Sequence, residues 1–166
     1  MANISEETIH NLYGDIRDAT EIALNTALPD ANQDSLAYIK LKMFMRLSLM
    51  SESKEYISEM GDVDQIIFEL KPLLVEELLN MGQSAAMDER LAIELMSYLE
   101  KEISFPMIRD VLNELMPDNK MKRFEVAGTL LQTGSDELRR RLVHSSGIDF
   151  PEGYPYMDEF EYIDSL

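Results

Sequence analysis

The chain has 166 residues, and 32 acidic against 15 basic residues give it a formal net charge of −17 at pH 7. A surface field of this sign favours cationic partners and disfavours direct binding to nucleic acid or anionic lipid. The chain has no cysteine, which excludes disulfides, thiolate metal sites and cysteine nucleophiles. Its apolar fraction of 45% is ordinary for a globular protein, and its length fits one domain of ~100–150 residues.

Apolar residues recur at three- and four-residue steps along most of the chain, which predicts an all-α fold. The first predicted helix begins after Ser5, a good N-cap residue, and ends at Pro29. The second covers about residues 35–50 and is apolar around most of its circumference, so we expect it at the centre of the fold. A short separate helix is predicted over residues 52–60.

The next predicted helix runs from Asp62, as its N-cap, to Gly82, and Pro72 is expected to kink or divide it because proline lacks an N–H. Four further helices are predicted over residues 86–103, 104–116, 120–132 and 135–144. No extended run alternates with a period of two, so no strand is expected. Residues 1–145 are thus predicted to form an irregular bundle of about seven or eight helices.

Residues 146–166 differ in composition from the rest of the chain and are predicted to be a mostly non-helical docking tail. This stretch carries six carboxylates, five aromatic side chains and no lysine or arginine. Aromatic anchors supply large apolar contacts, and carboxylates steer toward a basic surface. The candidate partner-binding residues are Phe150, Tyr154, Tyr156, Phe160, Tyr162 and Leu166. The last nine residues are similar in character to tails that dock on sliding clamps or polymerases in viral late transcription.

Six of the fifteen basic residues lie close together in the sequence: Lys120, Lys122, Arg123, Arg139, Arg140 and Arg141. If the two short helices that carry them pack as a hairpin, these residues form one basic patch. Three interpretations stay open. The patch is a solvated pair of helix ends, a site for an anion or a nucleic-acid backbone, or a surface for the acidic tail that follows it.

Evidence for catalysis is sparse. The run Glu59-Met-Gly-Asp62 is similar to the second metal-binding motif of the MazG-type nucleotide pyrophosphatases, which implies a magnesium-dependent hydrolase with carboxylate ligands. That family also needs an earlier Glu-Glu-x-x-Glu helix, and residues 34–50 contain no glutamate. Asp62 is therefore interpreted as an N-cap. His10 follows Glu7 in one Glu-x-x-His half-motif without a second copy, and we interpret it as a surface histidine.

These observations predict a non-enzymatic interaction module, such as an assembly adaptor, accessory factor or inhibitor, that needs no metal or cofactor. Its expected partner is a protein with a basic or apolar groove. An acidic mimic of nucleic acid is the alternative, and a hydrolase using Glu59 and Asp62 is a remote one. Self-association through a methionine-rich helix face also stays open. No apolar run is long enough to span a bilayer, so a cytoplasmic protein is expected.

Overall fold

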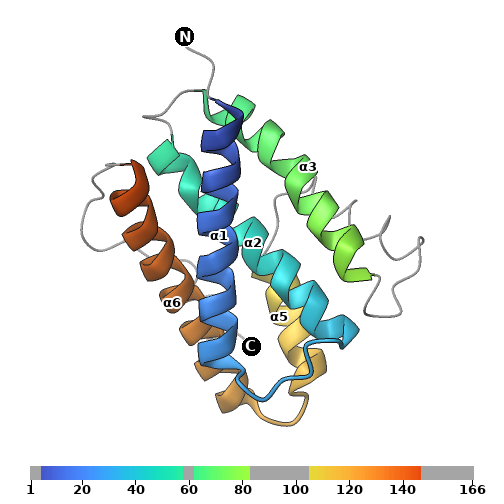
Figure 1. The fold of residues 1–166 in the computed structure, drawn as a ribbon. Helices are drawn as coiled ribbons and strands as arrows, with labels where there is room; N and C mark the ends of the chain where they lie inside the picture. The colour runs from blue at the N-terminus through green and yellow to red at the C-terminus, as the bar shows by residue number, and fades with distance from the viewer. Residues whose placement is uncertain (1–4, 58–61, 83–104, 147–166) are drawn as a thin grey trace.

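The structure is a computed structural model that describes residues 5–57, 62–82 and 105–146 (Figure 1). These residues form five α-helices and no strand, which confirms the all-α prediction. The helices are α1 (Glu6–Ala27), α2 (Leu36–Ile57), α3 (Val63–Gly82), α5 (Phe105–Leu115) and α6 (Lys120–Ser146). The predicted helix over residues 86–103 and the tail from residue 147 onward lie outside the described residues. In the part of the chain that is described, no helix is both long and apolar enough to cross a membrane.

Short polar side chains begin the helices where the sequence predicts them. Ser5 Oγ accepts a hydrogen bond from the Thr8 amide at 3.2 Å, at the start of α1. Asp62 Oδ1 accepts from the amides of Asp64 and Gln65 at 3.0 and 3.3 Å, at the start of α3. Each cap satisfies amides that have no partner within the helix. The prediction of Asp62 as an N-cap is confirmed.

Two predicted helix boundaries are wrong. The segment over residues 52–60 is not a separate helix, because α2 continues without interruption to Ile57. Pro72 lies inside α3, so of the two outcomes predicted for it, a kink or a division, the division is excluded. The predicted break at Gly134 is absent, because α6 is one helix of 27 residues. A Cβ atom on Gly134 would lie 3.2 Å from Met45 Cε and 3.5 Å from Leu49 Cδ2. This glycine therefore allows α6 to approach α2 closely.

Helix α2 lies at the centre of the fold and contacts all four of the other described helices. Every residue from Met43 to Met50 is buried, which confirms the expectation drawn from its apolar circumference. Helices α1 and α6 lie side by side in opposite directions, and α3 lies on the other side of α1 (Figure 1). One buried side chain in the middle of α2, Arg46, is charged.

Candidate functional site

Arg46 is the centre of a polar cluster that joins α1, α2 and α3. Its side chain has 0% exposure. Its Nε and Nη2 donate to the two carboxylate oxygens of Glu77 on α3, at 2.5 and 2.7 Å. Nη2 also donates to Glu21 Oε1 on α1 at 3.0 Å, and the Tyr13 hydroxyl donates to Glu77. Such a two-pronged guanidinium–carboxylate pair fixes orientation as well as neutralising charge.

Lys42 extends the cluster along α2. Its Nζ lies 3.1 Å from Glu21 Oε1 and 5.5 Å from the centre of the Tyr38 ring. Burial raises the pKa of the Glu21 carboxyl, but the hydrogen bond from Arg46 and the charges of Lys42 and Arg46 hold this pKa below its usual range. Burial and the neighbouring Glu77 raise the pKa of the Tyr13 hydroxyl far above its usual range. These groups hold each other in fixed charge states, so we interpret the cluster as a structural clamp.

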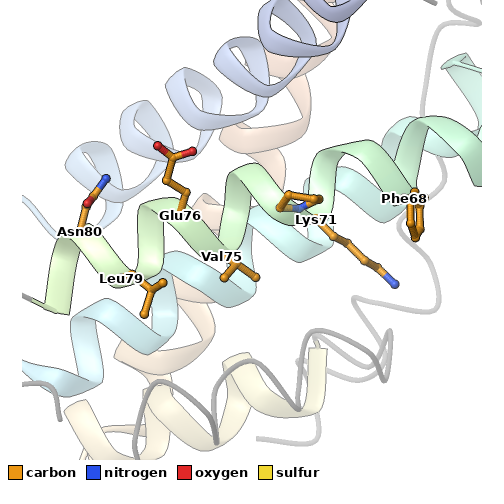
Figure 2. Close-up of a pocket in the computed structure, with 7 residues that line it drawn as sticks. Phe68, Lys71, Val75, Glu76, Leu79 and Asn80 are labelled. Carbon is orange, nitrogen blue, oxygen red and sulfur yellow. The ribbon is translucent and has the colours of Figure 1, made fainter. Parts of the chain in front are cut away.

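The outer side of α3 carries a shallow apolar groove of about 510 Å³ (Figure 2). Phe68 is 70% exposed and Leu79 is 49% exposed. Figure 2 shows Phe68, Lys71, Val75 and Leu79 pointing to one side of the helix, whereas Glu76 and Asn80 point to the other. The groove is lined by Phe68, Lys71, Pro72, Val75, Glu76, Leu79 and Asn80. A contiguous exposed apolar surface of this kind is characteristic of interaction sites.

Helix α3 therefore presents two apolar stripes. The inner stripe is buried against the bundle and includes Ile66, Leu70, Leu74 and Leu78. The outer stripe is built around Phe68 and Leu79, and the prediction of one apolar pattern along the helix does not include it. The signal is nevertheless in the sequence, since Phe68 and Leu79 do not fit the four-residue steps of the inner stripe.

The hairpin on which a single basic patch depended is not formed, because the two groups of basic residues lie on one continuous helix, α6. Arg123 and Arg139 are 16 residues apart on α6, which places them about 24 Å apart along the axis. Two of the C-terminal arginines are paired: Arg140 lies 2.5 Å from Glu137, and Arg141 lies 3.3 Å from Asp18 on α1. This end of the patch contributes to the packing of α6.

The N-terminal end of α6 is different. Arg123 Nη1 donates to the carbonyls of Met116 and Pro117 at 2.6 and 3.1 Å, so it holds the connection from α5. Lys120 and Lys122 are exposed, and their side chains form no ion pair with any other described residue. The apolar side chains beside them are exposed as well, with 75% exposure for Met121 and 42% for Phe124.

The remaining candidate residues do not form a site in the described part of the chain. Those residues contain no group of three or more histidine or acidic side chains arranged to hold a metal ion. Asp62 is engaged in the cap of α3, and Glu59 lies outside the described residues. His10 is exposed, as predicted, and its Nε2 lies 3.8 Å from Glu6. All six candidate residues of the tail, from Phe150 to Leu166, also lie outside the described residues.

Comparisons with known protein families, with the curated proteins and with solved structures find no match to this chain.

Proposed function

We propose that this protein is a non-enzymatic interaction module that binds a partner protein through the outer groove of α3. The observation that carries the proposal is the exposure of Phe68 and Leu79 on a helix whose opposite face is already fully packed. An aromatic side chain exposed in this way gains more from a partner than from water, because burying a phenylalanine stabilises by about 1.5–3 kcal/mol. The packed inner face means that the fold itself does not need the outer one.

The groove favours an amphipathic helix of the partner as its occupant. Phe68 and Leu79 are 11 residues apart, so the apolar stripe is about 16 Å long, or three helical turns. A helix laid along it presents its own apolar side chains at three- and four-residue steps. The exposed acidic residues of α3 include Asp64 and Glu76, so basic residues at the edge of the partner's helix complete the match.

The acidic aromatic tail is the second contact element of the proposal. Its six carboxylates and five aromatic residues suit a basic or apolar groove on the same partner. Two contacts on one chain strengthen binding, because the second contact forms within an existing complex. The module then acts as an adaptor whose bundle and tail hold one partner at two points.

The test compares three full-length baits in a lysate of the source organism. The first is the wild type, the second carries Phe68→Glu with Leu79→Glu, and the third carries Asn25→Gln with Gln33→Glu at exposed positions away from the groove. The proposal expects a partner that is captured by the wild type and the third bait and lost by the second. Binding of the purified partner to each bait is then measured by calorimetry, because capture alone does not show direct contact.

Equal affinity of the purified partner for the wild type and the groove variant would contradict the groove as the binding site. A second competition, with duplex DNA added, separates the adaptor from a nucleic-acid mimic. DNA displaces the chain from a mimicked surface with a steep dependence on salt, whereas it leaves a helix in the α3 groove in place.

A further inference from the structure

The outer face of α6 has three features that the fold does not explain. Lys120 and Lys122 form no ion pair with described residues, although the chain as a whole is strongly acidic. Met121 exposes 75% of its surface in the turn that the two lysines share. Gly128 lies two turns further along, where an added Cβ atom would meet no other atom within 4 Å.

The charge of α6 distinguishes it from the other exposed helices. It carries six basic and three acidic residues, whereas α1 and α3 each carry more acidic than basic residues. Its first turn has lysines and no acidic residue. The N-terminus of a helix carries a partial positive charge, so negative charge is favourable there and the lysines are not. A negatively charged ligand at this end would offset the repulsion between the lysines and the helix N-terminus.

Gly128 provides an independent observation. Glycine in the interior of a helix costs about 0.5–1 kcal/mol relative to alanine. Gly134, in the same helix, is explained by its close approach to Met45 and Leu49, but nothing in the described fold occupies the space beside Gly128. Glycine permits the close approach of another backbone. Met121, Gly128, Gln132 and Arg139 follow one another at steps of seven, four and seven, so they lie along one face of α6.

We propose that this face of α6 binds residues 147–166 of the same chain, with Met121 and Phe124 contacting the aromatic side chains of the tail. Lys120 and Lys122 flank Met121 on opposite sides of the face, and their long side chains pair with the tail carboxylates from its two edges. The inference rests on the proposed function, because it concerns the tail that the module offers to a partner. Bound to α6, the tail is withheld from that partner until the partner displaces it.

The length of the tail allows this path. Lys122 lies 24 residues before Ser146, or about 36 Å back along the helix axis. An extended chain covers that distance in about 11 residues at roughly 3.3 Å per residue. The tail has 20 residues after Ser146, so Phe160 and Tyr162 reach the turn that holds Met121. Glu125 and Asp136 are the acidic residues on this face. Because they repel the tail carboxylates, we expect the aromatic side chains of the tail to contact the middle of the helix.

The test uses the full chain and a single spin label, which is clean because the protein has no native cysteine. A nitroxide is attached to Gln132→Cys on α6 or, as the matched control, to Glu76→Cys in the α3 groove. The proposal expects the amide signals of residues 147–166 to be lost with the label on α6 and kept with the label on α3. Reduction of the nitroxide restores them.

Two variants decide whether the proposed contacts are responsible. Lys120→Glu with Lys122→Glu is expected to restore the tail signals, whereas Arg17→Glu with Lys40→Glu, the same charge change elsewhere, leaves them lost. Gly128→Gln fills open space without a clash in the bundle, and it is expected to restore the signals as well. A mixture of two kinds of chain tests whether the tail binds its own chain or a second copy. One kind carries the nitroxide without isotope enrichment, and the other is isotope-enriched without the nitroxide. Loss of the tail signals in this mixture would show that the tail binds a second copy.

Tail signals that stay unaffected by the α6 label would overturn the proposal, and so would loss caused by the α3 label alone. Neither result bears on whether a partner binds the α3 groove, which the lysate comparison tests with the groove variant. The two proposals therefore fail separately.

Discussion

The two faces of α3 use the same residue types for opposite purposes. On the inner face, Leu74 and Leu78 are fully buried and Glu77 is held by Arg46. On the outer face, Phe68 and Leu79 are as apolar but stay exposed. The inner face is buried by neighbours within the fold, whereas Phe68 keeps 70% and Leu79 keeps 49% of its surface exposed. The comparison shows that apolar character alone does not tell a core residue from a docking residue.

The largest loss of stability is expected when the buried charge of Arg46, which binds Glu77 on the inner face of α3, is removed. Arg46→Met leaves the carboxylates of Glu77 and Glu21 without their main partner at a partly buried site. Removing one member of such a buried pair costs about 3–5 kcal/mol, and we expect a loss of this size in the free energy of unfolding. Urea denaturation monitored by circular dichroism measures it. Adding Glu77→Met to Arg46→Met is expected to recover part of the loss, and no recovery would show that the pairing is not what stabilises the inner face.

The same leucine-to-alanine substitution on each face of α3 compares the two faces directly, because it removes the same atoms in both cases. Leu74→Ala on the inner face creates a cavity and is expected to cost about 2–5 kcal/mol. Leu79→Ala on the outer face removes the same atoms from a half-exposed position and is expected to change stability by less than about 0.5 kcal/mol. The same urea titration measures both variants. Equal losses would mean that the outer stripe is part of the core.

Acid is expected to weaken the inner face. The pKa of Glu21 is held below its usual range by Arg46 and Lys42, so the folded state favours its charged form. The stabilisation from this carboxyl is therefore complete above its unfolded pKa, near 4.3. It is lost as the pH falls through the lower pKa of the folded state. Unfolding free energies measured between neutral pH and pH 3 are expected to fall less steeply in Glu21→Gln than in the wild type, and parallel curves would contradict this.

The smallest effect on stability is expected on the outer face. Phe68→Gln replaces an exposed ring by a good helix former, and we expect the free energy of unfolding to change by less than about 0.5 kcal/mol. Thermal unfolding measures that change, and calorimetry with the purified partner measures binding. We expect binding to be weakened strongly by this variant and left intact by Asn25→Gln on α1, an exposed control position. A variant that unfolds instead would place Phe68 with the core.

The features that the sequence predicted correctly depend on local chemistry. Ser5 and Asp62 cap helices because their side chains bond to amides two or three residues away, and this pattern is visible in the chain itself. Gly134 misled the prediction because a glycine that ends a helix and a glycine that admits a neighbouring helix look the same in sequence. What distinguishes them is the approach of Met45 and Leu49, which belong to another helix.

The candidate site was less predictable for the same reason. Arg46 stands in an apolar run, and its burial depends on Glu77 and Glu21, which lie 31 and 25 residues away. The exposure of Phe68 depends on which side of α3 the bundle covers. A single basic patch required a turn within α6, which is one continuous helix. Each of these outcomes depends on tertiary contacts between helices that are distant in the sequence.

The pairing of α1 with α6 has a consequence for how the protein folds. These two helices form the most extensive helix–helix contact among the described residues, yet more than 90 residues of chain separate Ala27 from Lys120. Folding rates fall as contacting residues lie further apart in the sequence, so this bundle is expected to fold slowly for an all-α protein. During synthesis, at roughly 5–20 residues per second, several seconds pass between the completion of α1 and the appearance of α6, the helix that it contacts most extensively. A ribosome-bound chain that stops before α6 is therefore expected to be the form most dependent on a chaperone.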